Sequence, residues 1–133
     1  MRSALLHLRI TVLLAATKRS LRRQDTTATL RRYAPGSPFP AFDAESGMRA
    51  VRRAARALGA NCLAQSTALA VACARAGLDP ELILGCRRYA DGKWGAHAWI
   101  IVNAQVYDPL PSGEHQALAK ISAGTQWVPA PIK

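Results

Sequence analysis

Three residues of the sequence carry side chains that can act together on a peptide or another acyl group: Cys62, His97 and Asp108. A cysteine attacks a carbonyl carbon as its thiolate, a histidine takes up the thiol proton and returns it to the leaving group, and a carboxylate orients the histidine ring. Each residue alone also has an ordinary structural explanation, such as packing in a core. Together they predict a catalytic Cys-His-Asp site that needs no cofactor and no metal.

The position of Cys62 favours this chemistry. Asn61 is a good helix N-cap, and the alanine-rich and leucine-rich run over residues 62–76, stopped by Gly77, predicts a helix. Cys62 then lies in the first turn, where the helix dipole favours a thiolate. The N–H groups of that turn lack helical partners and can stabilise an oxyanion.

His97 and Asp108 are expected on neighbouring antiparallel strands. The alternation of apolar residues predicts strands over residues 82–89, 94–102 and 106–108, with Asp91-Gly92 as the first hairpin turn. If Asn103-Ala104 forms a two-residue turn, Asp108 lies opposite Trp99 and on the same face as His97. A three-residue turn would put His97 and Asp108 on opposite faces.

Helices are expected to precede this sheet. The spacing of Leu6, Ile10, Leu13 and Leu14 predicts a helix over roughly the first 17 to 20 residues. The segment 33–40 holds three prolines and predicts an extended connector, and residues 46–58 predict a basic helix capped by Gly59. Beyond Pro109 and Pro111, the tail from Ser112 to Lys133 has helical character around residues 115–121. The fold class is therefore α+β, with N-terminal helices followed by a small antiparallel sheet.

The other cysteines and histidines are assigned structural roles. Cys73 lies about three helical turns beyond Cys62, too far for a disulfide or for joint chemistry, and Cys86 is expected as a small buried residue of a strand. His7 falls in the terminal helix and His115 in a polar segment after the sheet, so neither is chosen as the base.

The cysteine count also bears on the cellular compartment. Three cysteines without C-x-x-C spacing argue against a disulfide framework and a conventional zinc site. The N-terminus loosely imitates a signal peptide, but His7 and Arg9 interrupt its apolar region. These features predict a cytoplasmic protein, and no stretch is apolar enough for an integral membrane segment.

Positive charge is concentrated in the first half of the chain. The 133 residues carry a net charge of +10 and are half hydrophobic, which predicts one folded domain over residues 1–133. Residues 1–60 hold 12 Lys and Arg against 3 Asp and Glu, whereas residues 61–133 hold 6 against 5. Such a surface can attract nucleic acid, acidic lipid or an acidic protein, or can simply be solvated. A nonenzymatic nucleic-acid-binding protein ranks last, because no recognised nucleic-acid-binding signature accompanies the arginines.

Several motifs together resemble a known family. They are Asn61-Cys62-Leu63-x-x-Ser66-x-Ala68-Leu69, Gly77, Gly85, Ala96-His97-Ala98-Trp99-Ile100 and Asp108. This pattern resembles the transglutaminase-like, papain-like cysteine protease domain of lasso-peptide maturation, and it is similar to the C-terminal domain of the microcin-processing protein. The resemblance covers residues 46–110 well and the N-terminal helix loosely.

The resemblance implies a leader peptidase of ribosomally made lasso peptides. Cys62 would attack the peptide carbonyl that joins leader and core, His97 would transfer the proton, and Asp108 would hold His97. Residues 1–45, the N-terminal helix and connector, are too few for an additional leader-recognition domain, so the catalytic core at residues 46–133 is expected to act with a separate leader-recognition-element protein and a lasso cyclase. Another transglutaminase-like amidase or acyltransferase activity is the alternative. The oxyanion-hole partner stays unassigned, because neither Gln65 nor Trp99 occupies the position of a papain-type glutamine.

Overall fold

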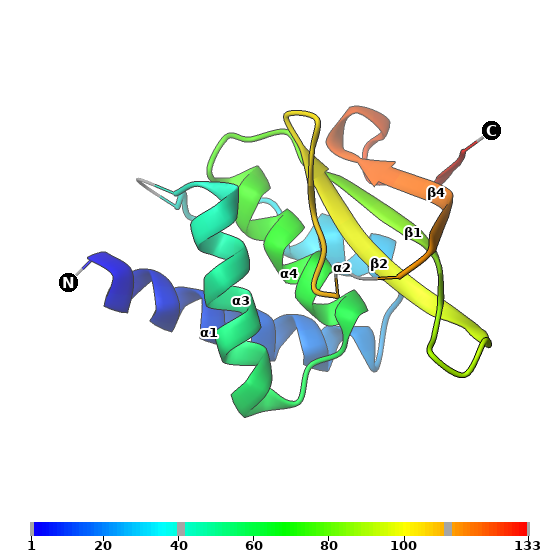
Figure 1. Ribbon diagram of the computed structural model, residues 1–133. Coiled ribbons are helices and arrows are strands. Elements are labelled where there is room, and N and C mark those ends of the chain that lie inside the picture. The colour runs from blue at the N-terminus through cyan, green and yellow to red at the C-terminus, as the bar shows by residue number, and fades with distance from the viewer. Residues whose placement is uncertain (1, 40–41, 111–112, 133) are drawn as a thin grey trace.

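The computed structural model describes residues 2–39, 42–110 and 113–132. Four helices precede the sheet: α1 (Arg2–Leu21), α2 (Thr26–Tyr33), α3 (Ala44–Leu58) and α4 (Cys62–Arg75). The strands are β1 (Glu81–Arg88), β2 (Trp94–Val102), β3 (Gln105–Tyr107), β4 (His115–Ser122) and β5 (Ala130–Pro131), with the short 3-10 helix η1 (Ala123–Thr125) between the last two. Figure 1 shows the helices gathered beside a twisted sheet, which confirms the α+β prediction.

Local sequence signals account for the ends of the helices that matter most. Asp43 caps α3 by accepting a hydrogen bond from the N–H of Ser46, and Gly59 ends the helix at a φ of 64°, in the left-handed region that glycine adopts readily. The side chain of Asn61 accepts a hydrogen bond of 2.9 Å from the N–H of Ala64, which fixes the start of α4. The predicted cap places Cys62 as the first residue of that helix.

The structure differs from the sequence-based expectation at α2, at the segment 115–121, and at η1 and β5, which were not predicted. Helix α2 was not predicted, although Asp25 caps it and Leu30 anchors it in the core. The segment 115–121, expected to be helical, is strand β4 instead. Its alanine, leucine and lysine residues favour helix locally, but the free edge of β1 offers a full ladder of backbone partners, and pairing overrides the local preference. Pro40, Pro111, Ser112 and Lys133, to which the sequence analysis also assigned places, lie outside the described residues.

The five-stranded sheet has the order β3-β2-β1-β4-β5, and neighbouring strands pair antiparallel. Val102 pairs with Gln105, so Asn103 and Ala104 form the predicted two-residue turn, with φ values of 51° and 64°. The ladder between β1 and β4 shifts register between Leu84 and Gly85.

The two faces of the sheet have different neighbours. Ala98, Ile100 and Val102 on one face of β2 join the main core, which also includes buried residues of α1, α3 and α4. His97 and Trp99 alternate with them and project from the other face. Within the described residues, no helix has the length and hydropathy that a membrane span requires.

Candidate active site

His97 and Asp108 form a buried pair. Nε2 of His97 lies 2.8 Å from Oδ1 of Asp108, and the two side chains are 0% and 3% exposed. The register explains the contact, because Ile100 pairs with Tyr107 and the next step along the hairpin brings Asp108 to the face that carries His97. A carboxylate acceptor assigns the ring proton to Nε2, which leaves a lone pair on Nδ1. Nδ1 is buried and has no hydrogen-bond partner among the described residues.

Asp108 is held from several sides. Its Oδ1 also accepts a hydrogen bond of 2.8 Å from the N–H of Leu110, which folds the chain sharply after β3. Its backbone carbonyl accepts a hydrogen bond from the guanidinium of Arg52, a residue of α3. Arg52 therefore differs from the exposed arginines of the same helix, because it links α3 to the backbone of the residue that orients His97.

His115 is the residue of this site that the sequence analysis did not select. Its ring stacks on His97 with 4.8 Å between centroids, and both rings lie close to Trp99, at 5.3 Å and 5.5 Å. Its Nδ1 lies 3.5 Å from Oδ2 of Asp108, an ion-pair distance when the ring is protonated but not a hydrogen bond. His115 is the first residue of strand β4. Because a helix was expected there, the sequence analysis did not place His115 beside His97. Burial along this strand alternates with a period of two, but that alternation arises only once the strand pairs with β1.

Gly85 leaves space for the packed rings of His97, Trp99 and His115. It pairs with His97 across the β1–β2 ladder, so a side chain at position 85 would project from the same face. A Cβ there would collide with the backbone carbonyl of Gln116 and would come within 3.1 Å of Trp99. A strand residue without a side chain therefore lets rings from β2 and β4 approach one another across β1.

Cys62 starts α4 and is half-buried. One turn later, the hydroxyl of Ser66 donates a 2.9 Å hydrogen bond to the carbonyl of Ala98, the residue next to His97, and so fastens α4 to β2. The amide of Gln65 donates to the carbonyl of Ala60 and braces the loop before the cysteine. The structure thus brings two predicted residues, His97 and Asp108, into direct contact. Among the described residues, the Cys62 thiol makes no hydrogen bond with either.

The first turn of α4 has free donors beside the thiol. The N–H of Ala64 is used by the cap, and the N–H of Gln65 bonds to the carbonyl of Asn61. Among the described residues, no acceptor is found for the N–H groups of Cys62 and Leu63. These two donors are suited to a developing oxyanion.

The other cysteines have different surroundings. Cys73 is fully buried in the core, and burial raises the pKa of its thiol to about 12, so it stays neutral near pH 7. Cys86 is half-buried in β1, and its sulfur lies 3.9 Å from the carbonyl oxygen of Gln116. Neither thiol belongs to the cluster around His97.

The cluster of two histidines and one aspartate invites the question of a metal ion. One ligand atom from each of His97, Asp108 and His115 lies within 4.8 Å of the others. A metal ion bound by imidazole lies near the plane of the ring, at about 2 Å from the nitrogen. The two rings are stacked with only 24° between their planes, so these planes do not meet close to both rings. This arrangement fits ring packing around a hydrogen-bonded pair better than shared coordination of an ion.

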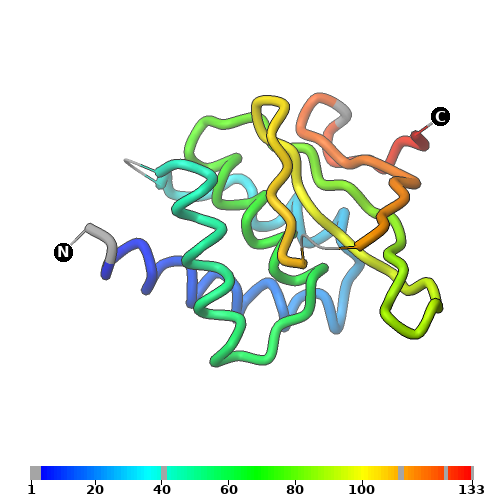
Figure 2. The backbone as a smooth tube through the Cα atoms, viewed as in Figure 1, coloured from blue at the N-terminus to red at the C-terminus, as the bar shows by residue number. Residues whose placement is uncertain are grey.

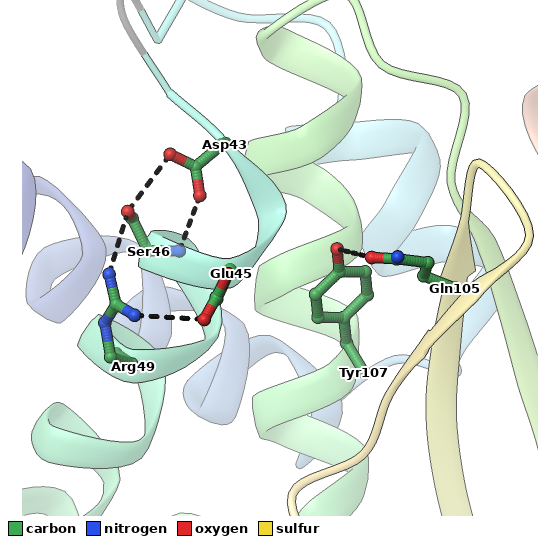
Figure 3. Close-up of polar contacts among 6 residues, drawn as sticks. All are labelled: Asp43, Glu45, Ser46, Arg49, Gln105 and Tyr107. Atoms are coloured by element: carbon green, nitrogen blue, oxygen red, sulfur yellow. Dashed lines mark hydrogen bonds and ion pairs between the residues drawn. The ribbon is translucent and has the colours of Figure 1, made fainter.

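A cleft of about 420 Å³ opens beside Asp108 and His115, between α3 and β3. Its lining also includes Glu45, Met48, Arg49, Arg52, Val106 and Tyr107. Figure 3 shows polar groups on both sides: Arg49 bonds to Glu45 and Ser46 on the helix, and Tyr107 donates to Gln105 at the hairpin. The cleft is therefore lined by apolar side chains, such as Met48 and Val106, together with charged ones, such as Glu45 and Arg49.

Comparisons with known proteins place the chain in a family. Curated proteins and solved structures give no significant match. The family described as the transglutaminase-like superfamily matches residues 4–123. Because this match runs from α1 to the start of η1, the chain belongs to the transglutaminase-like superfamily.

Proposed function

We propose that the protein is a cysteine peptidase with Cys62 as nucleophile, His97 as base and Asp108 as the residue that orients His97. The observation that carries the proposal is the buried His97–Asp108 pair, in which the second ring nitrogen of His97, Nδ1, has no hydrogen-bond partner among the described residues. A superfamily that includes Cys-His-Asp proteases and transferases, and a cysteine at the start of α4, support it.

The reaction divides into two acyl-transfer steps. His97 takes the thiol proton at Nδ1, and the Cys62 sulfur attacks the peptide carbonyl carbon while the free N–H groups of the first turn face the oxyanion. The C–N bond then breaks, the amine leaves with the proton from His97, and a thioester remains. Water, deprotonated by His97, hydrolyses the thioester and restores the thiol. Sγ and Nδ1 must approach to hydrogen-bond distance for this chemistry, and catalytic contacts commonly tighten when substrate binds.

The substrate we propose is a ribosomally made lasso-peptide precursor. The products are the free leader, which carries the new carboxylate, and a core peptide with a free N-terminal amine. The cleft beside Asp108 and His115 offers room for the segment next to the scissile bond. A leader-recognition-element protein would present the leader and raise its effective concentration, and a lasso cyclase in the same cytoplasmic assembly would consume the core.

The test is cleavage of a synthetic leader–core precursor by the full chain mixed with its recognition protein, followed by mass spectrometry. Cys62→Ala is expected to abolish cleavage, whereas Cys86→Ala, a matched change at another half-buried cysteine, retains it. Iodoacetamide should block activity by modifying Cys62 and should leave Cys73 unmodified in the folded protein, because that thiol stays protonated. Unchanged cleavage by Cys62→Ala would remove this residue from the mechanism.

The family match also fits acyl transfer to an amine instead of water. Adding hydroxylamine or a primary amine to the same mixture separates the two activities. A peptidase yields mainly the leader carboxylate, whereas an acyltransferase yields mainly the leader amide. A wild-type protein that only forms amides would replace the peptidase proposal with the transferase alternative.

A further inference from the structure

The outer surface of α1 carries a line of exposed apolar side chains. Leu5, Leu8 and Val12 are 58%, 59% and 62% exposed, and Ala15 is exposed in the same line. Their spacing of three, four and three residues keeps them on one side of the helix over about two heptads. In Figures 1 and 2, the first turns of α1 extend beyond α3 on the side away from the sheet.

Packing within the chain does not explain this line. The opposite side of α1 is already in the core through Ile10, Leu13 and Leu14. A surface helix normally carries polar residues on its outer side, whereas α1 is apolar on both sides. The outer line is therefore available to a second surface.

The width of the line favours a helix as the occupant. A strict three-four spacing gives a narrow seam, which fits the side chains of one partner helix. A helix that lies in a lipid surface has a broad apolar face opposite a strongly polar one. The inward side of α1 is apolar and buried, so this contrast is missing.

The charge of α1 indicates which kind of partner helix would bind. The sequence of α1 contains no acidic residue. Arg9 and Lys18 flank the line; they donate to carbonyl groups of Ser37, Pro38 and Leu58, which leaves their positive charge uncompensated, and exposed Arg19 continues the line. Two copies of α1 packed along this line would bring arginines together, so a second copy of the chain is disfavoured. Glutamate or aspartate at the flanking positions of a partner would complement these cations.

We propose that the seam formed by Leu5, Leu8, Val12 and Ala15 docks an amphipathic helix of another protein, one whose apolar stripe is flanked by acidic residues. This docking is independent of the catalytic proposal, because no residue of the seam belongs to the site around His97.

The experiment uses the full chain and a fluorescent helical peptide of about three heptads, with leucine at the core positions and glutamate at the flanking positions. Fluorescence anisotropy should show binding that weakens as salt rises. Leu8→Gln combined with Val12→Gln should weaken binding by about tenfold or more, because two seam contacts are lost. Leu118→Gln, at a residue of β4 that is 53% exposed, is the matched control and should bind as the unchanged protein does. Circular dichroism checks that the variants stay folded.

Three results would overturn the proposal. Equal binding by the seam and control variants would show that the peptide binds elsewhere. A lysine-flanked peptide that binds as well as the glutamate-flanked one would remove the charge argument. The third is seam-dependent dimers in sedimentation, or seam-dependent adsorption to vesicles of anionic phospholipid, with no binding of the acidic peptide. Such a result would assign the surface to a second copy or to a membrane.

Discussion

Asp108 uses its two carboxylate oxygens unequally. Oδ1 accepts from Nε2 of His97 and from the N–H of Leu110, so it is fully engaged. Oδ2 is buried, and His115 supplies the ion-pair distance of 3.5 Å described above. A buried carboxylate oxygen without a donor costs free energy, so His115 acts on His97 in two ways: by ring stacking and by steadying the carboxylate that orients it. We regard His115 as a positioning residue.

Two substitutions separate these contributions. His115→Phe keeps a stacked ring but removes the nitrogen that lies 3.5 Å from Oδ2 of Asp108, and it should lower kcat for precursor cleavage by about tenfold, the effect of roughly 1.4 kcal/mol. His115→Gln loses the ring but keeps an N–H donor, and it should retain more of kcat. KM should change little in both. Equal kcat values for the two variants in steady-state assays would show that contact with the carboxylate does not matter.

At the scale of elements, Gly85 and the register shift beside it decide whether the rings of β2 and β4 can meet across β1. The added Cβ of an alanine would meet backbone on one side and Trp99 on the other, and backbone cannot rotate away as a flexible side chain can. The distortion would spread into the pairing of β1 with β4 and would move His115 relative to His97.

Gly85→Ala is accordingly expected to lower the free energy of unfolding by about 1–3 kcal/mol, as overpacking typically does. Gly124→Ala serves as the comparison, because its added Cβ would come no closer than 4.0 Å to any described neighbour. Urea denaturation followed by tryptophan fluorescence would measure both. If the two alanine variants had the same stability, the close packing around Gly85 would not constrain the sheet.

The elements with clear local signals were predictable, and those that depend on distant pairing were not. Caps at Asn61 and Gly59 and the alternation along β2 define α4, the end of α3 and the central hairpin. Strand β4 depends on pairing with β1, which ends 27 residues before β4 begins.

 Because β1 ends at Arg88 and β4 begins only at His115, this pairing leaves no trace in a local sequence pattern. The position of His115 in the site could not be predicted for the same reason.

At the scale of the whole molecule, the positive charge of the first half of the chain is spread over α1, α2, α3 and the turn between α1 and α2. Arg53 and Arg56 are exposed on α3, whereas Arg52 of the same helix turns toward the carbonyl of Asp108. The charged surface and the support of the site are therefore carried by different arginines. A partner that binds the exposed arginines of α3 would sit beside the cleft, whose rim includes Arg49.

Reversal of one exposed charge tests this surface. Arg53→Glu should weaken binding of the proposed recognition protein or acidic leader severalfold at low salt, because exposed charge pairs contribute about 0.2–1 kcal/mol each. The difference should shrink as salt rises. Lys93→Glu makes the same change in charge at an exposed residue of the β1–β2 hairpin and should have little effect. Titration calorimetry that finds equal affinities for both variants would leave the arginines of α3 as a solvated surface.

The turn at Asn103 and Ala104 has a consequence for how the sequence can change. His97 and Asp108 are 11 positions apart, and the two-residue turn between their strands fixes the parity of that interval. Insertion or loss of a single residue there would rotate Asp108 to the far face of the sheet and separate it from His97, whatever residue was added. The number of residues in this turn therefore matters more for the His97–Asp108 contact than their identity.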